Sequence, residues 1–213
     1  MLDFITPFSF NIHNNGSSIL CGRGLSIFLF SFGLLSIPSD DTAKYFMKTP
    51  PASMVEYVLA QKSILVEGSA EYMLMEKFYK SIAKNLPEKN GVHIIDVRGL
   101  SFKRYLEIAK LTGSKVAVLT DNDADPQRNC IDKYTDYCDD ENIEIFFEKD
   151  PDRRTFEVVL YGDNQALCDK LFKENAQAYM LHNKTEAAYR LLSLDKELVV
   201  PDYIRRAIEW IKG

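Results

Sequence analysis

The stretch ILVEGSAE at residues 64–71 decides the fold of this chain. The apolar run SILV at residues 63–66 is short and suits a strand that is buried in a parallel sheet. Glu67 follows this run directly, and Gly68 permits a tight turn into a helix. Glu71 then falls in the first turn of that helix, close to the end of the same strand. The two carboxylates can therefore face one cavity.

A second stretch, VAVLTDNDAD at residues 116–125, repeats the pattern of an apolar run followed by acids. Asp121, Asp123 and Asp125 alternate with other residues, and an extended chain with this spacing places all three on one side. Ligands of open parallel sheets bind beyond the carboxyl ends of the strands. The acids of both stretches are thus candidate site residues if the two strands are neighbours.

Patterns typical of strands and helices alternate along the middle of the chain. Strands are expected at residues 63–66, 92–97, 116–120 and 143–147, and helices at residues 52–61, 70–85, 102–111 and 129–138. Helices separated by Gly162, Asn183 and Pro201 are expected from residue 155 to residue 212. This alternation predicts an α/β fold with right-handed βαβ units, in which helices flank a Rossmann-like parallel sheet of about four strands, and the tail forms a helical C-terminal extension.

Composition excludes several classes of protein. The 213 residues are 46% hydrophobic and 27% charged, which is the balance of a globular protein with one sizeable core. A formal charge of -5 argues against binding of nucleic acid by bulk positive charge, so any DNA contact must be local or bridged by metal. The cysteines have no spacing typical of zinc sites or disulfide frameworks; they are Cys21, Cys130, Cys138 and Cys168. A reduced, cytoplasmic setting is expected.

The first forty residues differ from the rest of the chain in charge. Asp3 and Arg23 are the only charged residues before Asp40, and residues 25–37 are almost wholly apolar. Thirteen residues are too few to span a bilayer, and the features of a signal peptide are poorly matched. The run is either a buried element or the remnant of a missing domain, and we favour the remnant. The expected division is therefore an apolar segment at 1–40, a catalytic core at 41–150 and a helical part at 151–213 that completes the site.

The acids of the two motifs suit a divalent metal site. Carboxylates that lie a few ångströms apart raise each other's pKa, so a cation is expected among them. All-oxygen ligands favour Mg²⁺ or Mn²⁺, and two such ions can act together on a phosphodiester. The alternative is that Glu71 caps its helix and that the Asp-rich segment is a solvated turn.

At these two motifs the sequence resembles the Toprim domain of topoisomerases, bacterial primases and OLD (overcoming lysogenization defect) nucleases. A Glu after the first strand and a DxD after the third are the Toprim signature. The OLD branch, which includes the nuclease of the Gabija phage-defence system, is more similar than the others. The segments that carry this similarity are PPASMVEYVLAQKSILVEGSAEYMLMEKFY (50–79), GLSFKRYLEIAKLTG (99–113), RRTFEVVLY (153–161) and NKTEAAYRLL (183–192).

The resemblance implies a Toprim-like fold and a role for each matching residue. Glu67 and Asp121 would be the central metal ligands and catalytic residues, with Glu71, Asp123 and Glu157 as further ligands. Lys184 would be catalytic by stabilising developing charge. From the residues alone, Glu157 reads as an exposed helix residue and Lys184 as a solvated residue near a helix start. Ser101 and Lys103, at the start of an expected helix, are weaker candidates for contact with a phosphate. Two arginine pairs, 153–154 and 205–206, are further weak candidates for contact with backbone phosphate.

The function implied is a Mg²⁺- or Mn²⁺-dependent DNA endonuclease, in phage defence or DNA processing. OLD proteins carry an ABC-type ATPase before the Toprim domain, but this chain has no GxxxxGK[ST] loop and hence no ATP site of its own. A separate ATPase domain or chain is an implied partner, and a homodimer or larger assembly without membrane association is expected. A topoisomerase or primase would need parts that are not visible in the sequence. The non-enzymatic alternative is a degenerate Toprim module that binds DNA or a partner ATPase.

Overall fold

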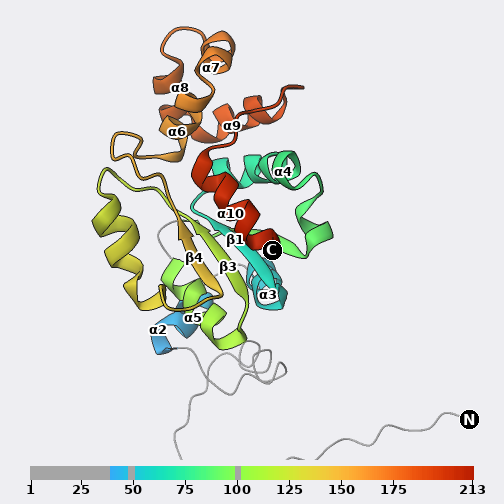
Figure 1. The fold of residues 1–213 in the computed structure, drawn as a ribbon, viewed down its shortest axis with the longest axis vertical. Coiled ribbons are helices and arrows are strands. Elements are labelled where there is room, and N and C mark those ends of the chain that lie inside the picture. Colours follow the sequence, from blue (N-terminus) through green and yellow to red (C-terminus); the bar gives the residue numbers. More distant parts are fainter. Residues whose placement is uncertain (1–38, 48–50, 99–101) are drawn as a thin grey trace, which may run out of the picture. The chain divides into compact units, whose positions relative to one another are not determined.

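The computed structural model describes residues 39–47, 51–98 and 102–213 (Figure 1). The apolar run at residues 25–37, Cys21 and the phosphate candidate Ser101 lie outside these described residues. The division of the chain at residue 40 is likewise not tested, because residues 1–38 are outside the described part.

Four parallel strands form one sheet in the order β2-β1-β3-β4. The strands are β1 (Lys62–Val66), β2 (Val92–Asp96), β3 (Lys115–Leu119) and β4 (Ile143–Phe146). Leu65 of β1 pairs with Ile95 of β2 on one side and with Val118 of β3 on the other. The predicted parallel sheet is confirmed. The two strands that lead into the acidic motifs are neighbours, so their carboxyl ends lie side by side.

Helices fill the connections as the alternating pattern predicts. Those before and between the strands are α2 (Asp40–Met47), α3 (Pro51–Leu59), α4 (Ser69–Ala83), η1 (Pro87–Asn90) and α5 (Phe102–Thr112). Those after β4 are α6 (Phe156–Asp163), α7 (Gln165–Phe172), α8 (Ala176–His182), α9 (Lys184–Leu192) and α10 (Asp202–Lys212). Helix α3 begins at Pro51, where proline's fixed φ and missing N–H are tolerated.

Alternation along the strands divides the core between the two faces of the sheet. Ile64, Val66 and Leu119 are buried in one cluster with residues of α4 and α6–α10. Leu65 and Val118 are also buried, and they point to the opposite face, where α3 and α5 pack. The hydroxyl of Tyr57 on α3 donates to the carbonyl of Tyr105 on α5 at 2.7 Å and joins these two helices. Each face of the sheet is therefore covered by helices.

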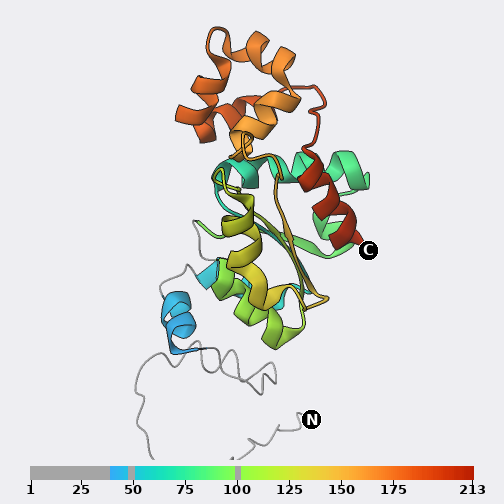
Figure 2. The ribbon, with the colours of Figure 1, turned by 60° about the vertical axis from the view of Figure 1, so that its left-hand side comes forward.

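The helices after β4 form a group beside α4, and the chain then returns to the sheet (Figures 1 and 2). Helix α9 packs along α4, whereas α10 lies on β3 and β4. Lys115 of β3 donates to the carbonyl of Trp210 at 2.8 Å, which anchors the end of α10 on the sheet. The helical extension thus includes a last helix that belongs to the α/β core.

Two local predictions are wrong. The expected helix at residues 129–138 is a π-helical turn, η2 (Gln127–Ile131), followed by a 3-10 helix, η3 (Asp132–Tyr137). Asn129 donates its side-chain amide to the carbonyl of Asn122 at 3.0 Å, and such bonds compete with a regular helix. Gly162 lies within α6 and separates no helices, since α6 ends at Asp163.

None of the described helices is long and apolar enough to cross a membrane.

Candidate active site

The first acidic motif joins β1 to α4 through a bend of two residues, Glu67 and Gly68, as the short connection predicts. Gly68 has φ -153° and ψ 178°, an extended conformation that any residue adopts, so the bend does not need the backbone freedom of glycine. A Cβ atom at Gly68 would lie 3.3 Å from Oε2 of Glu71, a close contact. Glycine therefore serves close approach to the Glu71 carboxylate. Glu67, the residue before Gly68, is half-buried. Glu71 lies in the first turn of α4, as predicted.

The second motif places Asp121 at the end of β3, where its carboxylate meets the start of α6. Oδ1 of Asp121 accepts the backbone N–H of Phe156 at 2.8 Å, which is the first residue of that helix. The backbone N–H of Asp121 points to Oε2 of Glu67 at 3.4 Å, a long hydrogen bond. The two motifs are thus directly linked, and Asp121 also joins the sheet to the helices that follow β4.

The other two aspartates of this motif do not share the side of Asp121 in the way the extended-chain argument predicts. Asp123 and Ala124 have φ values of 48° and 65°, so the chain turns there through the left-handed region. Asp123 and Asp125 are both exposed, but the negative charge of Asp123 still raises the pKa of Glu67. Asp125 accepts the backbone N–H of Arg128 at 3.0 Å and so stabilises the turn that follows. The prediction that period two aligns these acids is wrong because the chain is not extended here.

Asn122, which the sequence analysis did not single out, fixes the shape of this turn. It is buried, and its side-chain amide donates to the carbonyls of Glu148 and Asp150 at 2.8 and 2.9 Å. Its side-chain oxygen accepts the N–H of Ala124 at 2.9 Å. The tolerance of Asn for turns with local side-chain hydrogen bonds was the only available signal. Asn122 holds the loop after β3 against the loop after β4.

Glu157 and Lys184 meet although 27 positions separate them. Glu157 lies in the first turn of α6 with only 4% of its side chain exposed, so its reading as an exposed helix residue is wrong. Nζ of Lys184, the first residue of α9, lies 3.0 Å from Oε2 of Glu157. This contact is an ion pair without the geometry of a directed hydrogen bond, and Oε2 has no hydrogen-bond partner among the described residues. The Lys184 side chain is half-exposed, so its ammonium group remains open to solvent.

Electrostatics show that these groups share one environment. Burial raises the pKa of Asp121 to about 8, and the charges of Glu71, Glu67 and Glu157 add to this rise. Burial likewise raises the pKa of Glu71 to about 7, with further contributions from Glu157 and Glu67. Four carboxylates, two that follow β1 and β3 and two in the first turns of α4 and α6, therefore act on one another. An apo site with these values binds protons near neutral pH.

Two lysines partly offset this negative charge. Burial raises the pKa of Glu67, while the N–H of Asp121 and the charges of Lys133 and Lys184 lower it. Burial lowers the pKa of Lys184, but its contact with Glu157 and the charges of Asp121 and Glu71 outweigh this effect and leave it raised. Lys184 therefore stays protonated. Lys133, in η3, is a further cation near Glu67 that sequence reasoning missed.

The carboxylates of the candidate site are ligands of the kind that a hard divalent cation prefers. The carboxylates supply only oxygen, their crowding favours a cation among them, and Glu157 holds a buried oxygen without a hydrogen-bond partner. Within residues 39–47, 51–98 and 102–213, no three His, Cys, Asp or Glu side chains are already arranged as a metal cage. The carboxylates would have to move together to hold an ion.

Most of the other phosphate candidates are engaged elsewhere. Nε of Arg153 lies 3.6 Å from Oε2 of Glu148, and its guanidinium group also donates a hydrogen bond to Oδ1 of Asp163. Arg205 and Arg206 are both paired with Asp202. Lys103 is exposed on α5. Arg153, Arg205 and Arg206 therefore serve mainly to stabilise local structure.

The sheet with carboxylates after β1 and β3 defines a Toprim-type fold. Residues 58–123 match the family model "Overcoming lysogenization defect protein-like, TOPRIM domain", so this part of the chain is similar to the Toprim domain of OLD proteins. No curated protein sequence matches the chain.

Solved structures of similar fold come from two bacteria. The C-terminal region of the Burkholderia pseudomallei OLD protein has a TM-score of 0.56 at 17% identity, over 72% of this chain and 98% of that one. The C-terminal region of the Xanthomonas campestris pv. campestris OLD protein, phased with platinum, has a TM-score of 0.52 at 20% identity, over 74% and 94%. At these identities the similarity shows that the chains share a fold.

Proposed function

We propose that this chain is a divalent-metal-dependent endonuclease that hydrolyses DNA phosphodiesters. The observation that carries the proposal is the convergence of four carboxylates on one lysine at the carboxyl ends of β1 and β3. Glu67, Glu71 and Asp121 come from the two Toprim motifs. Glu157 and Lys184 come from the helices beyond β4 and complete the group. The match to an OLD-like Toprim domain supports the same activity.

In this proposal the carboxylates hold Mg²⁺ or Mn²⁺. Glu67 and Asp121 are the central ligands, and Glu71, Asp123 and Glu157 complete the sites. A bound divalent ion would polarise the phosphodiester and supply an activated water. Glu71 and Asp121 have a raised pKa, so they would lose protons as the ion binds.

Lys184 would act on the charge that develops on the phosphate as the bond breaks. Its ammonium group is protonated, half-exposed and held beside the acids by Glu157. A fixed cation at such a place stabilises developing negative charge without reorganising during the reaction. Glu157 would then serve twice, as a metal ligand and as the group that positions Lys184.

The resemblance to OLD proteins also supports an ABC-type ATPase domain or chain as the partner, with a role in phage defence or DNA processing. The chain would supply the cleavage site and the partner the ATP hydrolysis. A homodimer or larger assembly remains a prediction.

The deciding experiment is nicking of supercoiled plasmid by the purified chain. We expect nicking with Mg²⁺ or Mn²⁺, and none after a chelator is added. Glu67→Gln should remove the activity, whereas the control Glu144→Gln, an exposed acid on β4, should keep it. Metal-independent nicking, or equal activity of Glu67→Gln, would overturn the proposal. DNA binding without any cleavage would favour the binding-module alternative.

A further inference from the structure

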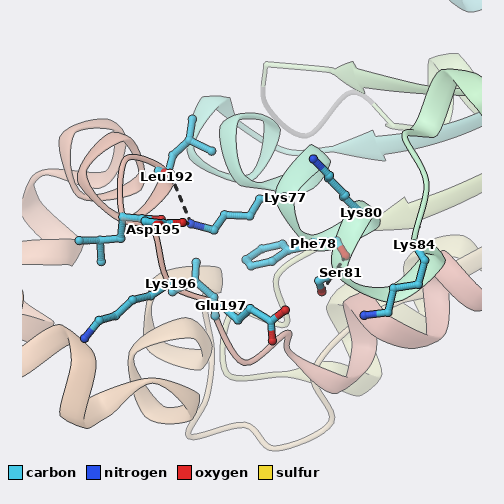
Figure 3. A pocket seen from close by; sticks show the side chains of 11 residues that line it. Lys77, Phe78, Lys80, Ser81, Lys84, Leu192, Asp195, Lys196 and Glu197 are labelled. Atoms are coloured by element: carbon cyan, nitrogen blue, oxygen red, sulfur yellow. Dashed lines mark hydrogen bonds between the residues drawn. The ribbon is translucent and has the colours of Figure 1, made fainter.

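A hollow of about 610 Å³ lies between α4 and the segment that joins α9 to α10 (Figure 3). Lys77, Lys80 and Lys84 line it from α4 and the residue after it, and Lys196 lines it from the opposite segment. Figure 3 shows Phe78 between these two walls. We call this hollow the lysine groove. It is separate from the acidic residues of the candidate active site.

The lysines of the groove have unequal roles. Lys77 donates to the carbonyls of Leu191 and Leu194 at 3.2 and 2.7 Å, so its ammonium group fixes the end of α9. Lys80, Lys84 and Lys196 form no ion pair or side-chain hydrogen bond within the part of the chain that the structure describes. Three lysines therefore have their charge available to a ligand.

Acids in the groove do not cancel this charge. Asp195 acts on Lys77, which leaves Glu197 as the acid that opposes the other three lysines. In Figure 3 the side chains of Glu197 and Lys84 extend into the same space. A local excess of positive charge in a chain of net charge -5 is a feature that an anionic ligand would match.

Helix α4 connects the groove to the candidate active site. Its first turn carries Glu71 and its last turn carries Lys80. Fifteen residues at 1.5 Å each give a helix of about 22 Å. A DNA strand, which rises about 3.4 Å per nucleotide, covers this length in about six or seven nucleotides. A duplex that is cut near Glu71 and extends about six or seven base pairs along α4 therefore reaches the groove.

We propose that the lysine groove binds backbone phosphates of DNA about six or seven base pairs from the bond that is cut. The proposal rests on the proposed function for the identity of the ligand. Lysine reads a phosphate as a point charge, so the groove would add affinity without sequence preference. It would make the chain prefer DNA that extends well beyond the cleaved bond.

The competing explanation is that Lys80 and Lys84 only offset the negative end of the α4 dipole. That role predicts lower thermal stability when the lysines are removed and no change in DNA binding. It does not account for Lys196, which comes from a different segment.

The test is equilibrium binding of the full chain to DNA hairpins with stems of about 4 base pairs, which are shorter than α4, and about 24 base pairs, in Ca²⁺ and across a salt series. The variant is Lys80→Ala with Lys84→Ala. The matched control is Lys44→Ala with Lys170→Ala, two exposed lysines on α2 and α7. On the long stem we expect the variant to lower the slope of log K against log salt by about 1.8, or about 0.9 for each lost phosphate contact. The short stem and the control should show no change.

Unchanged slopes on the long stem, with or without a lower melting temperature, would overturn the proposal. Equal losses on both stems would also overturn it, because the short stem does not reach the groove. If the chain cuts no DNA but the long-stem slope falls as expected, the groove stands and the proposed function fails. If the chain binds neither hairpin, the groove proposal fails whatever the cleavage assay shows.

Discussion

The two acidic motifs stand at neighbouring strand ends but are built differently. After β1 the chain passes through extended Gly68 directly into α4, and both glutamates belong to the candidate active site. After β3 the chain turns through the left-handed region, and Asp121 alone of the three aspartates is half-buried and bonded to α6. Spacing along the sequence thus indicates the sidedness of carboxylates only where the backbone between them is regular.

The sharpest test of this difference compares two aspartates of the same motif. Asp121→Asn should reduce metal-dependent nicking by at least about 10³-fold, because it removes a central carboxylate that no neighbour replaces. Asp125→Asn should keep nearly full activity, since Asp125 is exposed and serves the turn. Initial rates on plasmid, with circular dichroism to verify folding, would measure both. Equal losses in the two variants would show that the motif acts as one unit.

Lys184→Ala should have the next largest effect. We expect turnover to fall by about two to three powers of ten, the range for one electrostatic stabiliser, while affinity for DNA changes little. The measurement is single-turnover cleavage across a salt series, with binding in Ca²⁺. Lys170→Ala is the control, because this lysine is exposed on α7. A loss of affinity with unchanged turnover would instead make Lys184 a phosphate anchor.

Asn122→Ala tests what holds the second motif in place. The change leaves two partly buried hydrogen bonds to backbone carbonyls and one from the N–H of Ala124 unmade, so the free energy of unfolding should fall by about 2 to 3 kcal/mol. Asn129→Ala, which removes one bond to the carbonyl of Asn122, should lower it by about 1 kcal/mol. Urea unfolding of both variants gives the comparison. If Asn122→Ala is no worse than Asn129→Ala, the turn is held by other contacts.

The two motifs should also make the metal-free protein less stable at alkaline pH. Folding raises the pKa of Glu71 to about 7 and that of Asp121 to about 8, so the folded state binds protons more tightly than the unfolded state. The free energy of unfolding therefore falls as pH rises from about 4 to about 8. The fall should be at least about 1.4 kcal/mol, which corresponds to one pKa unit. Thermal unfolding in chelator at pH 5.5 and 8.5 measures the loss. Mg²⁺ should reverse it at pH 8.5, and Glu71→Gln with Asp121→Asn should flatten it.

Gly68→Ala should have the smallest effect and tests the first motif. The added Cβ would lie 3.3 Å from Oε2 of Glu71 and displace this carboxylate by a few tenths of an ångström. Because φ at Gly68 is ordinary, stability should not change, while cleavage should fall less than about tenfold. A large loss of stability would contradict the reading of Gly68 as a residue of close approach.

The sheet could be predicted well because short apolar runs mark each strand. The bounds of β1 to β4 agree with the expected ranges within one residue, and acids at two strand ends indicated the candidate site. The turn at Asp123 could not be predicted, since it depends on hydrogen bonds of Asn122 to the loop after β4. The side-chain bond from Asn129 to the carbonyl of Asn122 could not be predicted either, so η2 and η3 were expected as one helix.

Long-range contacts set the limit for the tail. The burial of Glu157 depends on how α6 packs with the helices around it, and no local pattern distinguishes it from an exposed acid. Its contact with Lys184 was reached only through the family resemblance. The return of α10 to β3 and β4 was also not predicted, because amphipathic periodicity shows that a helix has a buried face but not what covers it.

The contact between Asp121 and Phe156 bears on the order in which the protein is made. The carboxylates after β1 and β3 leave the ribosome first, whereas the N–H of Phe156 and the ammonium group of Lys184 follow later in the chain. A growing chain thus holds acids that lack the groups which fix and balance them. If cleavage needs Lys184, a molecule whose synthesis has not passed α9 is inactive.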